Sequence, residues 1–397
     1  MKEGWEYKKL GEICDFRSGF AFKSNKFTKM GEPIIRISDI QNEEIDDSNL
    51  VYFDPKSYTE DLSKYLIYPG DILIAMSGGT TGKLGINTSK RTFYLNQRVG
   101  VFRENKKYLN HRYLFYYLHT KSEESLRIAA GAAQPNLSTA QIKSFIIPVP
   151  PLSEQQSIVD YLDSAFAKID AMKANAEKAL NEAKALFQAS LKEMLEPKEG
   201  WEEKTLKALT SKIGSGATPK GGRKVYIEEG CHFIRSMNIQ YNEFKYDDLA
   251  HITDEAAEQL KGVEIKENDV LFNITGASIA RCCVVPADVL PARVNQHVSI
   301  LRLKQEVLPS FLSFIMNSPK HQKELLEIGK AGSTRQALTK TDLENHVICY
   351  PSLDNQKRLL YTLDSLKSKV DRLQENYDKI SQECDALKQA ILRQVFE

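Results

Sequence analysis

The sequence lacks the features of a membrane, secreted or metal-binding protein. It has no apolar run of the roughly eighteen residues that a membrane-spanning helix needs, and residues 1–5 lack the apolar stretch of a signal peptide. Its cysteines form neither a C-x-x-C pair nor a zinc-ligand spacing. We therefore predict a soluble, cytoplasmic protein with reduced, mostly buried thiols, no disulfide and no metal ion. The six cysteines are Cys14, Cys231, Cys282, Cys283, Cys349 and Cys384.

The chain also has almost no net charge, which by itself gives little support to nucleic-acid binding. Its formal charge is +1 at pH 7, but the basic and acidic residues are segregated along the chain. Residues 212–224 contain four basic residues and no acid. A second basic group lies near the N-terminus. From charge alone, two solvated loops explain this pattern at least as well as a binding surface. The second group consists of Arg17, Lys23, Lys26 and Lys29.

What the sequence does contain is a tandem duplication. The Gly-Trp-Glu at Gly4 recurs at Gly200, and the Pro-x-Leu-x-x-Gln that begins at Pro150 recurs at Pro351. Further landmarks recur in the same order between these ends. A period near two hundred residues that occurs only twice indicates a duplicated domain and excludes a solenoid of short repeats. The matched pairs include Arg36 with Arg235, Ile40-Gln41 with Ile239-Gln240, Gly70-Asp71 with Asn268-Asp269, Asn96-Gln97 with Asn295-Gln296, and Leu137 with Leu338.

The first part of each copy has the pattern of a mixed α/β domain. Short apolar runs bounded by Gly, Pro and Asn predict strands at residues 33–37, 71–74 and 145–147. Helical spacing predicts helices at residues 113–127 and 310–328. The fold class is therefore α/β in the mixed, α+β sense, and the sequence leaves the strand order open.

The second part of each copy predicts one long helix. After Pro151, Ser153 and Gln156 form a capping-box pattern, and no Gly or Pro follows until Pro197. Apolar residues recur at heptad spacing in both copies, with small residues in the first and larger ones in the second. We expect two helices packed together, each about 60 Å long. The rows are Ile158, Ala165, Met172, Ala179, Leu186 with Leu162, Ile169, Ala176, Ala183, Ser190, and Leu359, Leu366, Leu373, Ile380, Leu387 with Leu363, Val370, Tyr377, Cys384, Ile391.

Connectivity predicts that the two helices are antiparallel. The second α/β domain leaves the end of the first helix and leads into the start of the second, and the termini of a domain usually lie close together. We expect a dumbbell with an approximate two-fold axis. The expected parts are a first domain at residues 1–150, a helix at 151–197, a second domain at 198–351 and a helix at 352–397.

A glycine-rich segment invites a phosphate-loop interpretation that fails. Residues 77–84 follow an apolar strand, but Ser77 replaces the first glycine and Leu84 replaces the Ser or Thr that binds magnesium. The second copy keeps only a terminal cation, Arg281, in place of Lys83. Both cations are candidates for contact with a DNA phosphate, although an ordinary surface turn fits either one equally well.

These landmarks, in this order and in both copies, resemble the specificity subunit of type I restriction-modification systems. The resemblance covers the whole chain. Its most specific element is the Pro-Pro-Leu-Ser-Glu-Gln run from Pro150 to Gln155, which enters the long helix. The second copy departs from it with Pro351-Ser352-Leu353-Asp354-Asn355-Gln356, which leaves the start of that helix less certain.

The resemblance implies a non-catalytic subunit with two target recognition domains that bind the halves of a split, asymmetric sequence in double-stranded DNA. Its helices would set the gap and hold two adenine N6-methyltransferase (modification) subunits, to which restriction subunits add. S-adenosylmethionine, ATP and Mg²⁺ would be bound by those partners and no cofactor by this chain. The chain lacks Asn-Pro-Pro-Phe-like or Asp-Pro-Pro-Tyr-like motifs, as this role requires.

Side chains that can pair with base edges or phosphates are the candidate DNA-binding residues. The Asn-Gln pairs could equally be structural caps. The loops around Gln134 and Arg335 differ between the copies, as divergent recognition requires. The candidates are Arg17, Lys23, Arg36, Lys83, Asn96, Gln97, Arg98, Gln134, Asn136, Lys220, Arg223, Lys224, Arg235, Arg281, Asn295, Gln296, His297, Arg335 and Gln336.

The sequence alone leaves two other classes of function open. One is a coiled-coil scaffold that bridges partner proteins without binding DNA. The other is a nuclease or transferase in its own right, against which the lack of a cofactor loop and of a histidine triad argues. Sequence-selective DNA retention, with and without a methyltransferase partner, would separate the three.

Overall fold

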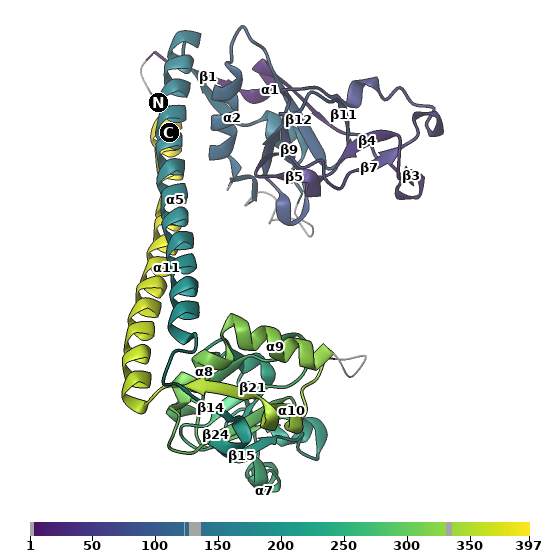
Figure 1. Cartoon of the computed structure of the whole chain (residues 1–397). Coiled ribbons are helices and arrows are strands. Elements are labelled where there is room, and N and C mark those ends of the chain that lie inside the picture. Colours follow the sequence, from purple (N-terminus) through teal and green to yellow (C-terminus); the bar gives the residue numbers. More distant parts are fainter. Residues whose placement is uncertain (1–3, 123, 127–135, 331–335) are drawn as a thin grey trace. The chain divides into compact units, whose positions relative to one another are not determined.

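The computed structural model describes residues 4–122, 124–126, 136–330 and 336–397. These residues form two compact units. Unit 1 comprises residues 1–177 and 377–397, and unit 2 comprises residues 178–376. Each unit holds one α/β domain, called domain 1 or domain 2 here, together with half of each long helix (Figure 1). The two-domain, two-helix fold predicted from the duplication is confirmed.

Domain 1 is built on two sheets and a terminal ribbon. The ribbon pairs β1 (Glu6–Lys9) antiparallel with β13 (Ile146–Val149), which joins the start of the domain to its end. The larger sheet has the order β2-β12-β9-β10-β6-β5 and the smaller one the order β3-β7-β4-β11-β8. The larger sheet comprises β2 (Cys14–Ser18), β12 (Val99–Glu104), β9 (Ile72–Ala75), β10 (Leu84–Ile86), β6 (Glu43–Ile45) and β5 (Ile40–Gln41), and the smaller one β3 (Phe27–Thr28), β7 (Val51–Phe53), β4 (Glu32–Ile35), β11 (Phe93–Leu95) and β8 (Leu66–Ile67).

Domain 2 repeats this plan with fewer strands in each sheet. The ribbon is β14 (Glu202–Thr205) with β25 (Val347–Tyr350), and the sheets have the orders β15-β24-β21-β22 and β16-β20-β17-β23. A separate hairpin, β18-β19, stands where β5 and β6 stand in domain 1. The bounds are β15 (Thr210–Ser215), β24 (Val298–Leu303), β21 (Val270–Asn273), β22 (Cys282–Val284), β16 (Tyr226–Ile227), β20 (Ala250–Ile252), β17 (Cys231–Ile234), β23 (Ala292–Val294), β18 (Ile239–Gln240) and β19 (Glu243–Phe244).

The central strands are apolar on both faces because both faces are covered. In β9, Ile72 and Ile74 pack against the helices, whereas Leu73 and Ala75 face the smaller sheet. In domain 2, Val270 and Phe272 of β21 likewise belong to the helix-side core. The alternation of side chains along these central strands therefore places one hydrophobic layer on each face of the larger sheet.

The turn before each central strand explains one landmark of the duplication. Gly70 and Asn268 have φ of 86° and 68°, a left-handed conformation that Gly and Asn adopt most readily. The aspartate that follows is held by an arginine of the next strand in the sheet. Arg103 lies 2.6 Å from Asp71 and Arg302 lies 2.7 Å from Asp269, and this carboxylate hydrogen bond raises the pKa of each arginine.

Most of the shorter helices pack beside the larger sheet of their domain, whereas α7 packs against the smaller sheet of domain 2. The helix expected at residues 310–328 is two helices, because Pro319 begins a new helix after a break at Asn317 and Ser318. The helix expected at residues 113–127 begins two residues earlier than predicted. The described short helices are α1 (Leu10–Ile13), α2 (His111–Thr120), α4 (Thr139–Lys143), α6 (Leu206–Leu209), α7 (Asp254–Gln259), α8 (Pro309–Met316), α9 (Pro319–Lys330) and α10 (Lys340–Asn345).

The long helices are α5 (Leu152–Leu195) and α11 (Leu353–Phe396), and they run antiparallel inside each unit (Figure 1, teal and yellow). In unit 1, Lys173 contacts Asp385 at 3.2 Å and Lys388 contacts Asp170 at 2.6 Å. In unit 2, Lys184 donates to Gln374 at 2.7 Å. Rising numbers on one helix meet falling numbers on the other, as antiparallel packing requires.

One of the two predicted heptad rows lies in the seam, and the other is buried only in part. Leu162, Ile169 and Leu363 are buried as expected, but Met172 and Leu186, from the other row, are exposed by 60% and 64%. The second row of the seam is displaced by one residue. On α5 it runs through the positions of Phe166, Lys173, Leu180 and Phe187, which are buried or half-buried.

The predicted capping box at the start of α5 was also wrong. The helix begins at Leu152, before Ser153. The Gln156 side chain bonds to Asn110 and Asp160, each at 2.8 Å, and so does not cap the helix.

Candidate nucleic-acid interface

Four segments meet at one edge of domain 2 and define what we call its loop face: residues 216–220, 274–281, 295–297 and 336–338. Backbone hydrogen bonds join three of them. Ile274 N donates to His297 O at 3.0 Å, and Leu338 N donates to Ile274 O at 2.8 Å. Gly276 N donates to Gln336 O at 3.4 Å. The middle segment is thus held on both sides.

A chain of side chains joins the same loops. Thr218 Oγ1 donates to Gln296 Oε1, Gln296 Nε2 lies 3.2 Å from His297 Nε2, and His297 Nδ1 lies 2.6 Å from Thr275 Oγ1. Gln296 is exposed and His297 half-buried. These four polar side chains therefore form an ordered donor and acceptor array at the loop face.

Domain 1 has the same loop face, made of residues 19–23, 76–83, 96–98 and 136–138. Met76 N donates to Arg98 O at 2.8 Å, and Leu137 N donates to Met76 O at 2.7 Å. Gln97 N donates to Phe20 O at 2.9 Å. The backbone frame is therefore common to both domains, while its exposed side chains differ.

A glycine in each domain allows the first loop to approach this frame. A Cβ atom on Gly19 would lie 2.0 Å from Leu95 O, and one on Gly216 would lie 1.8 Å from Val294 O. Any side chain would push the loop away from the strand that leads into the Asn-Gln pair. This close approach explains why a Ser-Gly dipeptide stands at the same place in both copies, as Ser18-Gly19 and Ser215-Gly216.

The Asn-Gln pairs divide between structure and surface. Asn295 is buried, and its Oδ1 accepts from His297 N at 3.0 Å. Asn96 Oδ1 accepts from Arg98 N at 3.4 Å. These asparagines brace their own turns, so the capping interpretation holds for them. The exposed Gln97, like its counterpart in domain 2, points to solvent.

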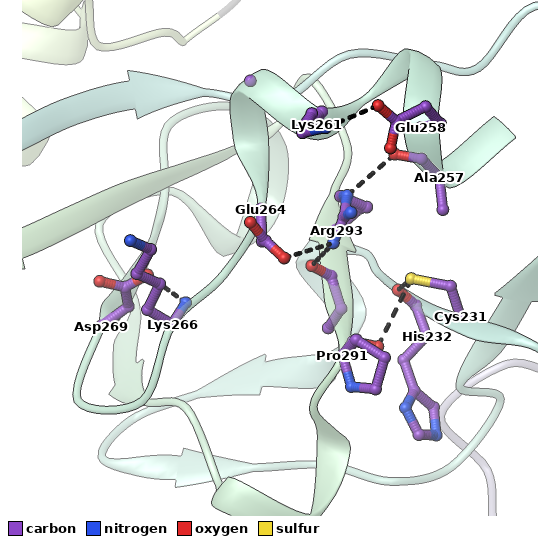
Figure 2. A network of polar contacts seen from close by, with 12 residues as sticks. Cys231, His232, Ala257, Glu258, Lys261, Glu264, Lys266, Asp269, Pro291 and Arg293 are labelled. Carbon is purple, nitrogen blue, oxygen red and sulfur yellow. Dashed lines mark hydrogen bonds and ion pairs between the residues drawn. The ribbon is translucent and has the colours of Figure 1, made fainter. Parts of the chain in front are cut away.

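Arg293 anchors the strand that enters this turn in domain 2. Its Nε donates to Ala257 O at 3.0 Å, its Nη1 donates to Ala292 O at 3.0 Å, and Glu264 lies 3.8 Å away (Figure 2). The arginine is only 7% exposed. Its hydrogen bond to Ala257 joins β23 to α7 and so holds the strand that leads into Asn295. The duplication could not indicate this role, because the residue that matches Arg293 in domain 1 is Tyr94.

Arg36 and Arg235 occupy matched positions but are engaged within their domains. Arg36 Nη2 lies 3.1 Å from Asp39 and donates to Asn49 O at 3.2 Å. Arg235 Nη2 donates to the backbone oxygen of Asp248. Both side chains are half-buried. The arrangement suits a role in holding the following turn more than direct contact with a base.

The two matched cations have different surroundings. Lys83 is exposed after a short 3₁₀ turn. Arg281 donates to Gln240 at 2.8 Å and its guanidinium carbon lies 5.2 Å from the Tyr241 ring centroid. Lys83 is therefore exposed to solvent, whereas Arg281 is held by contacts with the β18-β19 hairpin.

The remaining candidates lie at the surface or outside the described residues. Lys23, Asn136 and Gln336 are exposed, and Arg17 is paired with Asp15 at 2.8 Å. Gln134 and Arg335 lie outside the described residues. The basic segment of domain 2 is exposed as expected, at Lys220, Arg223 and Lys224.

Sequence reasoning missed several residues of this interface. Thr218 and Thr275 were not predicted because a single threonine has no spacing that indicates a binding site. Gln240 was not predicted because the Ile-Gln pair to which it belongs was interpreted as structural.

The family comparison agrees with this duplicated interface. The pattern described as Type I restriction modification DNA specificity domain matches residues 2–182 and again residues 198–382. The chain belongs to this family. The repeat that the sequence revealed is thus a repeat of the specificity domain itself, with one loop face in each copy.

Relatives in the specificity family match over nearly the whole chain. The type I restriction enzyme EcoBI specificity subunit of Escherichia coli is 25% identical over 428 residues, which cover 100% of this chain and 86% of that protein. The putative MjaX specificity subunit of Methanocaldococcus jannaschii is 27% identical over 407 residues, covering 96% and 91%.

Solved structures show the same fold. One, described as the basis of complex assembly and conformational transition of the type I R-M system, matches with a TM-score of 0.76 at 20% identity, covering 99% of this chain and 97% of that one. The HsdS subunit from Thermoanaerobacter tengcongensis matches with a TM-score of 0.60 at 20% identity, covering 100% and 97%.

Two further predictions about the chain can be compared with the structure. All six cysteines are buried and unpaired, so the predicted burial is confirmed. Among the described helices, none is both long and apolar enough to cross a membrane.

Proposed function

We propose that each domain of this specificity-family chain binds one half of a bipartite DNA target through its loop face. The observation that carries the proposal is one backbone frame bearing different side chains. The two loop faces share Gln97 and Gln296 but differ beside them, where domain 1 presents Arg98 and Asn136 and domain 2 presents His297 and Ala337. Equal frames with unequal donors and acceptors are what two different half-sites require.

Basic residues beside the loop faces would contact phosphates without selecting a sequence. Lys83 in domain 1 and Lys220, Arg223 and Lys224 in domain 2 are exposed and have the length to reach a backbone. The near-zero net charge is no obstacle, because counterion release depends on local contacts.

The long helices would hold two copies of one partner. In unit 1, Met172 and Leu387 are exposed by 60% and 48%, and their duplicates in unit 2, Leu373 and Leu186, by 37% and 64%. We call these the unit 1 and unit 2 helix patches. Large exposed apolar side chains at equivalent places suit two identical modification subunits, to which restriction subunits would add.

The chain itself would catalyse nothing. S-adenosylmethionine for adenine methylation, and ATP and Mg²⁺ for cleavage, would be bound by the partner subunits. The relatives are named as specificity subunits, which supports this division of labour.

The test is DNA retention by the purified full-length chain, measured on a library of duplexes with and without a modification subunit. We expect one split sequence to be enriched, and no methylation or cleavage by the chain alone. Retention of partner proteins with no selected sequence would favour a scaffold. Turnover by the isolated chain would favour an enzyme.

A further inference from the structure

A buried cluster of potential metal ligands lies in domain 2, away from the loop-face contacts. His321 and Glu324 are one turn apart on α9, and His346 ends α10. His321 Nδ1 lies 2.8 Å from His346 Nε2 and 3.7 Å from Glu324 Oε2. The three ligand atoms all lie within 4.8 Å of one another.

We infer that His321, Glu324 and His346 bind one divalent transition-metal ion of the zinc class. Two imidazole nitrogens and one carboxylate oxygen are donors that Zn²⁺ accepts. The two imidazoles are only 7% and 6% exposed, so their donors are already held together. The Glu324 side chain is 44% exposed, which leaves the fourth position to water.

The ion requires only a small adjustment. Two nitrogens bound at about 2.0 Å to a tetrahedral ion lie roughly 3.3 Å apart, about half an ångström more than the observed 2.8 Å. Rotation of two side chains can supply this change. Glu324 would approach from its present ion-pair distance.

Burial of the two imidazoles is the main cause that lowers the pKa of each to about 4, with Lys320 contributing to both and His346 to His321. In their hydrogen bond, one of the two facing nitrogens carries the proton. That imidazole would offer its lone pair to the ion as the other tautomer. The positive charge of Lys320 disfavours a bound metal ion nearby. The negative charge of the Glu324 carboxylate offsets this repulsion.

Domain 1 does not repeat the cluster. Phe145 stands where domain 2 has His346, and Lys121 Nζ lies 5.9 Å from its ring centroid. An apolar ring with a cation over it cannot bind a metal. The site is therefore specific to domain 2, which explains why the duplication gave no hint of it. The spacing hid it as well, since its two histidines are 25 residues apart.

A bound ion would join α9 to the end of α10. These elements flank the segment that contains Gln336, whose backbone oxygen accepts from Gly276. The ion would thereby stabilise the backbone frame of the domain 2 loop face. The inference itself does not depend on DNA binding, because it concerns metal affinity and stability alone.

The experiment is a zinc titration of the full-length chain, freed of metal by a chelator, in competition with a chromophoric chelator. We expect one ion per chain, a higher midpoint of thermal unfolding with zinc, and tetrahedral absorption bands when Co²⁺ replaces it. His346→Phe, which copies domain 1, should remove the ion.

Two further variants keep the test decisive. Glu324→Gln changes a half-exposed side chain and should fold while weakening the affinity. His251→Phe is the matched control, because His251 and His232 form another close pair, with ring centroids 4.9 Å apart, but belong to no such cluster among the residues that the structure describes. An unmodified chain that takes up no ion, or variants that bind as tightly as it does, would show that the two histidines only share a hydrogen bond.

Discussion

At the scale of single residues, two buried glutamines explain the most specific motif of the sequence. Gln155 donates to Tyr108 O and Pro150 O and accepts from Asn110 N, each at 2.8 Å. Gln356 makes the same three contacts in domain 2, with Glu306 O, Pro351 O and Leu308 N. The Pro-x-Leu-x-x-Gln motif therefore fastens each long helix to the loop before α2 or α8.

The first prediction concerns this fastening. Gln155→Ala should lower the local unfolding free energy around α2 by about 2–4 kcal/mol, because it removes three hydrogen bonds and strands a buried N–H. Native-state hydrogen exchange of the α2 amides would measure the change. Gln156→Ala, at an exposed neighbour, should cost less than about 1 kcal/mol. Equal losses from both changes would show that the buried amide has no special role.

The second prediction separates base recognition from phosphate contact. Replacing Gln336, or the adjacent Arg335, by Ala should relax selectivity at one half-site by about 1–3 kcal/mol per lost base contact. Replacing Lys220 or Lys224 should instead weaken binding to all DNA sequences alike and reduce the dependence of the affinity on salt concentration. Binding to specific and random duplexes at several salt concentrations would test both. A Gln336 or Arg335 change that weakened specific and random DNA equally would contradict the assignment.

At the scale of elements, the sequence predicted which segments form strands or helices better than it predicted the residues at which they begin and end. The apolar runs at residues 33–37 and 71–74 became β4 and β9 with shifts of one or two residues, because a short apolar run between turn residues is typical of a strand that is buried on both faces. The strand order could not be predicted, since it depends on non-local pairing. Pro319 divides a helix that periodicity alone had joined.

The long helices show the same limit in the heptad pattern. The row through Leu162 and Ile169 is buried. The heptad pattern assigned Met172 and Leu186 to the second row of the seam, but both side chains are exposed to solvent. The companion row is partly polar, with Lys173 paired to Asp385, so hydrophobicity could not reveal it. For the loop faces, the sequence identified the right segments but could not separate bracing asparagines from exposed glutamines.

The third prediction follows from the misplaced row. Met172→Glu with Leu387→Glu should remove one modification subunit, and Leu186→Glu with Leu373→Glu should remove the other, because a charge at each helix patch cannot be buried without a partner. The mass of the assembled complex would report the stoichiometry. As a control, Glu substitution of the exposed Ala171 should leave two subunits bound. Full assembly by both double variants would place the docking surface elsewhere.

At the scale of the whole molecule, the duplication gives one chain two equivalent units. Each unit contains a domain, the beginning of one long helix and the end of the other. In unit 1 the Phe396 ring lies 5.1 Å from that of Tyr113, and in unit 2 Leu191 and Leu195 join the domain core. Each helix is thus fixed to a domain at both of its ends.

The fourth prediction treats the helices as a ruler. Four residues inserted after Asn175 add about 6 Å of helix, which at 3.4 Å per base pair lengthens the gap by one or two base pairs. The insertion shifts the seam by a stutter, which antiparallel helices absorb by local unwinding. We expect unchanged half-sites with a longer spacer and lower stability. Methylation mapping that finds the original gap at full activity would contradict the ruler.

The most direct test of the central claim, one half-site for each domain, is an exchange of domain 2. Residues 200–350 would be replaced by those of a relative with a known target, and methylated sites would be mapped across a genome in the presence of the modification subunits. The account predicts a hybrid target in which one half-site changes and the other stays. A folded hybrid that assembles with its partners but changes or loses both half-sites would contradict it, because the domains would then recognise DNA jointly.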